Sequence, residues 1–552
     1  MNYPAIRSAQ ALITILKAKG IQEIVISPGS RNAPLTLGFN LDPFFKTYSI
    51  VDERCAAFFG LGIAQQINRP VAMVCTSGSA LLNYYPAVAE AFYQQVPLII
   101  ISADRPASKI DIGDGQTIRQ QNVFENHSLF NANLIEDDTP ENHEKIVQAI
   151  AHCMHKKGPV HINIPFEEPL YELTETACSF PILKEIDPET TAFELSNEAI
   201  DVWKKSSKKL VLIGDMKPNS LDAAVVDFLA NEPSIVVMSE TTSNVNHPCF
   251  LNKIDAIITP FSEPDFENFK PDLLITIGGM LVSKRIKSFL RKYKPAHHWH
   301  VDALRAYNTF DCLTAHFKTD VNTFFKEISF HQSHFSNYQS EFLAIKNKRK
   351  EAHDLFMLDA PFSDMKVFEI ILKIIPAATM LQISNSSPIR YTQLFDLPPN
   401  QALFCNRGTS GIDGSTSTAI GAAVGSKMPT LLITGDLSFF YDSNALWNSY
   451  IPTDFKIIVI NNSGGGIFRI LPGHQENEIF STYFETTHHL TSEHLAKMYH
   501  FEYFRASEIS VLNNVFDDFL RATKPAILEI FTPKNENDLV LKSYLSFLGN
   551  NQ

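Results

Sequence analysis

The chain has few of the features that mark secreted or membrane proteins. Its seven cysteines are scattered, odd in number and never spaced as a C-x-x-C pair, which argues against a disulfide framework or a zinc site. No apolar run approaches the roughly 20 residues that a membrane helix needs. The first 20 residues carry Arg7, Lys17 and Lys19, so they predict an amphipathic helix and not a signal sequence. We therefore expect a cytoplasmic protein.

Basic charge is also scarce. The formal net charge is -13, and the sequence pI is near 5.8. Such a chain lacks the Lys and Arg excess that would neutralise nucleic-acid phosphates or anionic lipids, so we expect neither as a partner. Arginines gathered in one cleft could still bind small anions. No G-x-G-x-x-G follows an early strand, which argues against a Rossmann dehydrogenase.

The rest of the composition is that of a multidomain globular protein. Hydrophobic residues make up 45% of 552 residues, which is enough for several cores and suggests about three domains. Short β-rich runs alternate with helical stretches, and this order predicts an α/β fold of mostly parallel sheets flanked by helices. We expect domains at 1–178, 179–357 and 358–552, with a linker near 166–200 and a charged helical connector at 340–356. The expected strands are 23–27, 70–75, 96–102, 159–164, 208–215, 234–238, 272–278, 298–302, 379–384, 401–406, 429–436, 455–462 and 525–531, and helices are expected at 53–67 and 79–94.

The strongest functional signal lies in residues 431–465, where two strand-like runs each end in a polar turn. Because the carboxyl ends of parallel strands meet at one edge, Asp436 and Asn462 should lie side by side. Their oxygens suit Mg²⁺, with Mn²⁺ as an alternative, and the helix after Asp436 would aim its amides at a diphosphate. A strand that ends in Gly-Asp is common in α/β proteins and by itself is weak evidence for a metal site. The combination of Asp436 with Asn462 at the end of the next strand is the stronger evidence. The expected metal ligands are Asp436, Asn462 and the Gly464 carbonyl, and the expected diphosphate contacts are Gly435, Leu437 and Ser438.

This pairing resembles the signature of thiamine-diphosphate-dependent enzymes, Gly-Asp-Gly followed further along by Asn-Asn. Here the third position is Leu437, which indicates a particular subfamily. The resemblance implies that Ile412 presses between the two rings of a bent cofactor. It also implies that Glu53, from the partner subunit, hydrogen-bonds the aminopyrimidine ring. Apolar neighbours such as Phe58 should raise the pKa of Glu53 and let it shift a proton; without the resemblance, Glu53 would be an ordinary first-turn helix glutamate.

Further segments, in the same order along the chain, resemble one branch of this superfamily, the enzymes that join 2-oxoglutarate to isochorismate in menaquinone biosynthesis. The resemblance implies decarboxylation of 2-oxoglutarate and conjugate addition of the succinyl carbanion to isochorismate, with release of CO2. It also implies pyrimidine-binding, central Rossmann-like and diphosphate-binding domains, in a homodimer or homotetramer whose active site lies between subunits. The matching segments are 27–35, 51–54, 76–83, 102–106, 115–120, 283–285, 384–390, 406–414 and 435–472.

The same resemblance assigns the substrate contacts. Both substrates carry carboxylates, which planar arginine side chains bind with two hydrogen bonds. Gly115 stands where family members often carry Asn, so a side-chain contact beside Gln116 is lost or replaced by a backbone one. The expected isochorismate contacts are Ser30, Arg31, Arg105, Gln116 and Lys284, with Arg285 in addition; Ser386, Arg390 and Arg407 would hold the oxoglutarate carboxylate, and Ile467, Phe468 and Leu471 would form an apolar wall.

Two other functions stay open. Another thiamine-dependent 2-oxo-acid decarboxylase or carboligase, such as an acetolactate synthase, would need a small apolar pocket with few cations. A catalytically silent relative, binding a nucleotide-like ligand or serving as a scaffold, would be expected to lose Glu53, Asp436 or Asn462, and all three are present. The first alternative depends on whether Arg31, Arg105, Arg390 and Arg407 converge on the cofactor.

Overall fold

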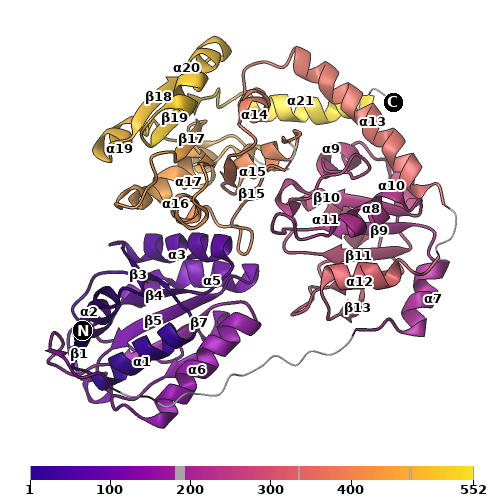
Figure 1. Ribbon diagram of the computed structural model, residues 1–552. Helices are drawn as coiled ribbons and strands as arrows, with labels where there is room; N and C mark the ends of the chain where they lie inside the picture. Colours follow the sequence, from indigo (N-terminus) through magenta and orange to yellow (C-terminus); the bar gives the residue numbers. More distant parts are fainter. Residues whose placement is uncertain are drawn as a thin grey trace.

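A computed structural model describes residues 2–178, 180, 193–332, 336–398, 400–471, 473 and 475–550. The chain forms three α/β units, each built on a parallel sheet with helices against it (Figure 1). This confirms the expected fold class. The middle of the expected linker, including the boundary residue 179, lies outside the described residues. Within the described part, no helix is both long enough and apolar enough to span a membrane.

The first unit has a six-stranded sheet in the order β3-β2-β4-β5-β7-β6, with all neighbours parallel. One expectation is wrong here: part of the linker, β8, pairs antiparallel with β1 at the start of the chain. The helix expected over 79–94 is interrupted at Tyr84 and becomes α4 and α5. The bounds are β1 (Tyr3–Pro4), α1 (Arg7–Ala18), β2 (Glu23–Ile26), α2 (Ala33–Leu41), β3 (Lys46–Ser49), α3 (Glu53–Ile67), β4 (Val71–Cys75), α4 (Ala80–Asn83), α5 (Tyr85–Gln94), β5 (Leu98–Asp104), η1 (Ala107–Lys109), η2 (Glu125–His127), β6 (Asn131–Asn133), α6 (Pro140–His155), β7 (Val160–Pro165) and β8 (Leu173–Thr174).

The second unit has a parallel sheet in the order β10-β9-β11-β12-β13. Strands β9, β10 and β11 are buried along their whole length, which explains why Leu, Ile and Val dominate their sequences. The long helix α13 follows this unit and leads to the third. The bounds are α7 (Asn197–Lys205), β9 (Lys209–Ile213), α8 (Ala223–Asn231), β10 (Ile235–Ser239), η3 (Thr241–Ser243), α9 (Ile254–Ile258), α10 (Glu263–Phe269), β11 (Leu273–Ile277), α11 (Lys284–Lys292), β12 (His297–Val301), β13 (Leu313–Phe317), α12 (Val321–Ile328) and α13 (Tyr338–Leu358).

The third unit has a six-stranded parallel sheet in the order β15-β14-β16-β17-β19-β18. Its last helix, α21, packs against α13, so the end of the chain returns to the second unit (Figure 1). The bounds are α14 (Asp364–Ile374), β14 (Met380–Ile383), α15 (Ser387–Thr392), β15 (Leu403–Phe404), α16 (Ser415–Ser426), β16 (Thr430–Gly435), α17 (Asp436–Tyr441), η4 (Ser443–Leu446), β17 (Lys456–Asn461), α18 (Ile467–Ile470), η5 (Phe480–Phe484), α19 (Glu493–Met498), β18 (Glu502–Ala506), α20 (Ile509–Arg521), β19 (Ala526–Phe531) and α21 (Asn537–Asn550).

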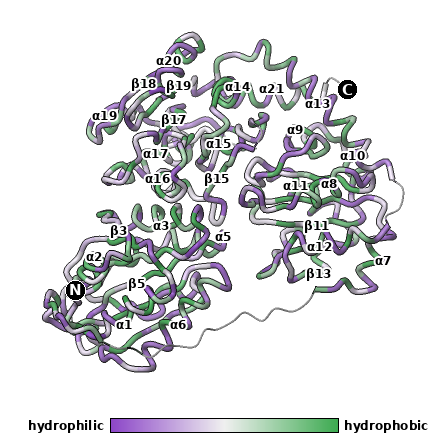
Figure 2. The backbone as a smooth tube through the Cα atoms, in the orientation of Figure 1, coloured by the Kyte–Doolittle hydropathy of each residue, from purple (hydrophilic) through white to green (hydrophobic). Residues whose placement is uncertain are grey.

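Helices α3 and α16 join the first unit to the third. Small residues allow their backbones to touch, because a Cβ at Gly62 would lie 2.1 Å from the carbonyl oxygen of Thr418, and one at Gly421 would lie 2.0 Å from that of Phe59. Their buried side chains belong to one hydrophobic cluster that runs through both units. In Figure 2 the hydrophobic colour is concentrated on the strands, the helices carry both colours, and the loops are mostly hydrophilic.

Candidate active site

The carboxyl edge of the third sheet holds a pocket of about 150 Å³. Strands β16 and β17 pair in parallel there, with Gly435 opposite Ile460, so Asp436 and Asn462 follow neighbouring strand ends as the sequence predicts. Both side chains line the pocket and are buried. Helix α17 begins at Asp436, so its first amides lie at the same edge. The other predicted site residues that line this pocket are Ser386, Ile412, Gly435, Leu437, Ser438, Gly464, Ile467 and Phe468.

The hydrogen bonds around the two strand ends leave one oxygen free for a cation. The Asn462 Nδ2 donates to Asp364 at 2.9 Å, while the Asn462 Oδ1 is buried and has no partner among the described residues. The Asp436 Oδ2 accepts from the Gly464 amide at 2.9 Å, and the His488 Nε2 lies 3.2 Å from the same oxygen. Carboxylate, amide and backbone oxygens are the ligands that Mg²⁺ prefers. In the described part of the chain no group of three or more His, Cys, Asp or Glu residues could hold a metal, so an ion here would depend on this mixed set.

The loop that carries Ile412 is held by residues from two units. The Ser438 hydroxyl donates to the Ile412 carbonyl at 2.6 Å, and the Asn385 amide donates to the Gly411 carbonyl at 2.7 Å. On the other side Glu90, from α5 of the first unit, accepts from the Gly408 amide at 2.7 Å and the Thr409 amide at 2.6 Å. Burial raises the pKa of the Glu90 carboxyl, although these donors oppose the shift.

A second cavity, of about 810 Å³, opens beside the first. The two share Ser387, Tyr391, Ile467 and Phe468 as lining residues. The second cavity is also lined by the predicted substrate residues Lys284, Arg285, Arg390 and Leu471. Ser386, at the start of α15, has φ 74° and ψ -127°, a strained backbone conformation of the kind found at functional sites. The structure thus brings cationic side chains next to the pocket that holds Asp436.

Two carboxylates, the buried Glu240 and the half-buried Asp255, support the segment that carries Lys284 and Arg285. Glu240 accepts from the amides of Val282 and Ser283, each at 2.7 Å, and Asp255 accepts from the Ser283 hydroxyl. Burial raises the pKa of Glu240 to about 7. These acids therefore fix the start of α11 at the wall of the cavity.

The other predicted substrate residues lie elsewhere. Ser30, Arg31 and Arg105 follow strands β2 and β5 at the carboxyl edge of the first sheet, and Gln116 adopts φ 54° close to Gly78 after β4. None of the described residues that line the two cavities comes from the first unit. Within one chain, the predicted residues therefore form two separate groups.

Arg31 and Glu53 belong to the group on the first sheet. The buried Arg31 guanidinium donates to the Phe166 carbonyl at 3.0 Å and to Glu168 at 3.2 Å. Glu53 begins α3, and burial raises the pKa of its carboxyl, as the apolar neighbours predict. An acid of this kind can hold a proton closer to neutral pH than a solvated glutamate.

Arg407 lines neither of the two cavities, although it contacts Asn385, which lines the Asp436 pocket. It donates to Asn385 at 2.7 Å and to the Leu281 carbonyl at 3.2 Å, and it lines a small pocket of about 130 Å³ with Tyr93 and Asp215. The four arginines expected to converge therefore do not do so within one chain. The Arg407 contacts with Asn385 and Leu281 tie the third unit to the second.

Models of known protein families match the chain in three consecutive parts. Residues 6–129 match "Thiamine pyrophosphate enzyme, N-terminal TPP binding domain", 181–383 match "Middle domain of thiamine pyrophosphate", and 386–530 match "Thiamine pyrophosphate enzyme, C-terminal TPP binding domain". The chain belongs to the thiamine pyrophosphate enzyme family. Thiamine pyrophosphate is the same compound as thiamine diphosphate, so the resemblance stated from the sequence is confirmed.

Several curated members of this family are similar to the chain over its full length. The protein from Flavobacterium johnsoniae is 59% identical over 99% of this chain and 100% of its own. The proteins from Christiangramia forsetii and Porphyromonas gingivalis are 49% and 38% identical, each over 99% of this chain and 100% and 98% of their own. All three are named 2-succinyl-5-enolpyruvyl-6-hydroxy-3-cyclohexene-1-carboxylate synthase.

Several residues that shape the site escaped the sequence analysis. Asp364, Glu90 and His488 lie outside the segments that carry the resemblance, and each reaches the site from a distant part of the chain. Asn385 lies inside such a segment, but its position gave no sign that it holds the 406–414 loop. Of these residues, only Glu90 could have been suspected from the sequence, because it is the single acidic residue in a mostly apolar helix.

Proposed function

We propose that the protein acts as a 2-succinyl-5-enolpyruvyl-6-hydroxy-3-cyclohexene-1-carboxylate synthase of menaquinone biosynthesis. It would decarboxylate 2-oxoglutarate and add the succinyl group to isochorismate, as a decarboxylating transferase. The observation that carries this proposal is the continuity of the Asp436 pocket with a cavity lined by Lys284, Arg285 and Arg390. Cationic groups of this kind suit di- and tricarboxylate substrates and not pyruvate.

The pocket residues fit thiamine diphosphate and a divalent ion. The free Asn462 oxygen, the Asp436 carboxylate and the Gly464 carbonyl would hold Mg²⁺, or Mn²⁺ in its place. Gly435, Leu437 and Ser438 would contact the diphosphate, and Ile412 would support the rings. When bound, the cofactor serves as the electron sink for decarboxylation.

The chain's own side chains would bind the substrates and exclude water. Arg390 and Ser386 would orient the 2-oxoglutarate carboxylates, while Lys284 and Arg285 would bind isochorismate. Phe468 and Leu471 would cover the reacting carbons. Arg407 donates hydrogen bonds to Asn385 and to the Leu281 carbonyl. It would contact a substrate only after its guanidinium breaks the bond to Asn385.

The remaining residues would come from a second copy of the chain. Ser30, Arg31, Glu53, Arg105 and Gln116 lie on the first sheet and do not line the two cavities of their own chain. In a homodimer, or a tetramer built from such dimers, the partner's first unit could complete each site. Glu53 would then hold or move a proton at the cofactor ring, and its raised pKa suits that task.

We further propose that the three sheets correspond to a pyrimidine-binding domain (1–178), a central domain (179–357) and a diphosphate-binding domain (358–552). The middle family model runs to residue 383, yet β14 (Met380–Ile383) pairs with β15 and β16 of the third sheet. Sheet pairing therefore supports a boundary before α14.

Anaerobic turnover of 2-oxoglutarate with isochorismate tests the proposal, with and without thiamine diphosphate and Mg²⁺. We expect cofactor-dependent loss of isochorismate and a product with the mass of the succinylated adduct. Decarboxylation without the adduct would contradict the acceptor and favour another thiamine-dependent decarboxylase. Tight cofactor binding with no reaction would contradict the enzymatic role and favour a catalytically silent relative.

A further inference from the structure

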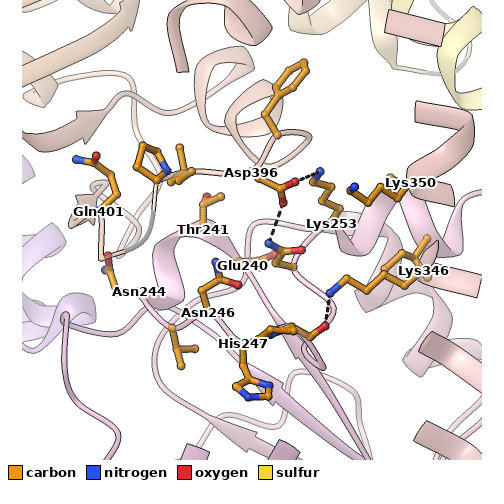
Figure 3. A pocket seen from close by; sticks show the side chains of 18 of the residues that line it. Glu240, Thr241, Asn244, Asn246, His247, Lys253, Lys346, Lys350, Asp396 and Gln401 are labelled. Atoms are coloured by element: carbon orange, nitrogen blue, oxygen red, sulfur yellow. Dashed lines mark hydrogen bonds and ion pairs between the residues drawn. The ribbon is translucent and has the colours of Figure 1, made fainter. Parts of the chain in front are cut away.

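A third large cavity, of about 650 Å³, lies at the junction of the second and third units. Its walls come from the segments after β9 and β10, from α9 and α13, and from the 395–401 segment of the third unit (Figure 3). It has no lining residue in common with the Asp436 pocket or with the cavity that holds Arg390. Its volume is in the range of small-molecule sites.

Cationic side chains gather on one wall of this cavity. Lys346, Arg349 and Lys350 recur at three- and four-residue spacing along α13, so they share one helix face, and all three line the cavity. Lys253, from the segment before α9, lies near them. In Figure 3 Lys253, Lys346 and Lys350 reach in from one side, and Gln401, Asn244 and Asn246 lie on the other. This concentration of positive charge contrasts with a chain whose net charge is -13.

The two acidic side chains among the described lining residues already have hydrogen-bond or ion-pair partners. Glu240 accepts from the amides of Val282 and Ser283, and Asp396 forms an ion pair with Lys253 at 2.9 Å. Among the described residues, neither Lys346 nor Arg349 forms an ion pair. The Lys346 ammonium donates to the carbonyls of Pro248 and Phe250, and the Arg349 guanidinium donates to the Leu548 carbonyl.

Buried polar atoms without partners also line the cavity. Arg349 and Gln401 are each 7% exposed, and the Arg349 Nε and the Gln401 Oε1 have no hydrogen-bond partner among the described residues. Burying a cation without a partner is costly, and a bound anion that accepts from the Arg349 Nε would offset that cost. The Gln401 Oε1 is an acceptor, so it would need a donor group on the ligand. The Asn246 amide lines the same space and adds a further donor, whereas the Asn244 amide already donates to the carbonyls of Met216 and Leu403.

We propose that this cavity binds a small polyanion, a molecule with two or more carboxylate or phosphate groups, at a site separate from the cofactor and substrate pockets. Lys346, Arg349 and Lys350 form its charged wall. Lys350 is the most accessible of them, because its side chain is 60% exposed and, within the part of the chain that the structure describes, its one acidic partner is Asp354 on the same helix at 3.7 Å. It can turn to a ligand without disturbing the fold.

Titration calorimetry of the holoenzyme, saturated with thiamine diphosphate and Mg²⁺, tests this site with two probes. Tricarballylate represents carboxylates and fructose 1,6-bisphosphate represents phosphates, so the probe that binds identifies the chemical class. We expect saturable binding of at least one probe, weakened about tenfold in Lys350→Gln and further in the Lys346→Gln/Lys350→Gln double variant, as expected for lost charge-assisted hydrogen bonds.

Lys348→Gln is the matched control, because Lys348 is exposed on the same helix and does not line the cavity. It removes the same charge and should leave the affinity unchanged. The proposal is overturned if neither probe binds the holoenzyme, if Lys348→Gln weakens binding as much as Lys350→Gln does, or if Arg390→Ala abolishes binding while Lys350→Gln does not. The last result would place the probe in the substrate cavity.

Discussion

Among single residues, Asn462 shows how one hydrogen bond selects the atom that faces a site. Its Nδ2 donates to Asp364, so its Oδ1 is left to point toward the Asp436 pocket. Burial raises the pKa of Asp364 to about 6, while Asn462 and Thr532 donate to it. A carboxylate that only supports another side chain can thus matter for metal binding as much as a ligand does.

We expect Asp436→Asn to weaken binding of thiamine diphosphate in the presence of Mg²⁺ by more than about tenfold, because the change removes the charged member of the proposed ligand set. Quenching of tryptophan fluorescence during a cofactor titration measures the affinity. Asp454→Asn, on an exposed loop, removes the same charge and should have no effect. Equal affinity in Asp436→Asn and the native protein would remove Asp436 from the metal site.

The buried carboxyl of Asp215 predicts that the stability of the protein depends on pH near neutrality. Burial raises the pKa of Asp215 to about 7, against the opposing effect of Arg407. Its folded-state pKa lies above the unfolded value, so its contribution to stability is complete at low pH and is lost as the pH rises through about 7. For one such group the loss between pH 6 and 8 is about 1.4 kcal/mol.

Asp215→Asn should therefore gain thermal stability relative to the native protein as the pH is raised from 6 to 8. Differential scanning calorimetry at the two pH values measures the difference in Tm. Asp227→Asn, at an exposed position of α8, serves as the control. An unchanged difference in Tm between the two pH values would show that Asp215 is already ionised at pH 6.

Among the helices and strands, the α3–α16 pair depends on glycine at the points of closest approach. Both helices also begin near the site: α3 starts at Glu53, and α16 follows the loop that carries Ile412. A change in their separation should therefore affect stability and the cofactor pocket together. The sequence pattern identifies α3 but does not reveal its partner.

We expect Gly421→Ala to destabilise the protein by about 3 kcal/mol, because the new Cβ would meet the Phe59 backbone and no side chain can move away. Gly425→Ala is the control on the same helix, since its Cβ would lie 3.1 Å from the Cα of Ile63, and helix propensity favours alanine. Thermal unfolding followed by circular dichroism compares the two. Equal Tm values would mean that the helices can separate freely.

For the assembled protein, the division of the site residues between two parts of the chain has a direct consequence. Arg390, in the third unit, lines the proposed substrate cavity, whereas Glu53 begins a helix of the first unit. A site that needs both residues from different copies can be rebuilt from two different inactive variants. A site within one chain cannot.

We expect Glu53→Gln and Arg390→Ala each to lose most synthase activity, and a co-expressed mixture to recover up to about a quarter of the native activity, because half of the dimers are mixed and each carries one intact site. Steady-state turnover of the purified mixture measures this recovery. A mixture of Arg390→Ala with Asp436→Asn should stay inactive, since both changes lie in the same unit. Failure of the first mixture would argue for a site within one chain.

Local patterns in the chain were sufficient for much of the fold. The alternation of β-rich and helical runs predicted three parallel α/β units, because buried parallel strands require unbroken apolar runs and crossover helices. Asp436 and Asn462 could be placed together because each follows a strand end, and parallel strand ends share an edge. The pairing of β8 with β1 was missed, since two-residue strands carry no periodicity.

Contacts between distant segments were decided only by the tertiary structure. Glu90 holding the Gly408 loop, Asp364 orienting Asn462 and Glu240 supporting the start of α11 each join residues far apart in the chain. The cavity lined by Lys346, Arg349 and Lys350 also depends on tertiary structure, because it forms where one face of α13 lies opposite Phe395, Asp396 and Gln401. Sequence periodicity reports which face of a helix or strand is buried, but it does not report what that face is buried against; that depends on how the three units pack.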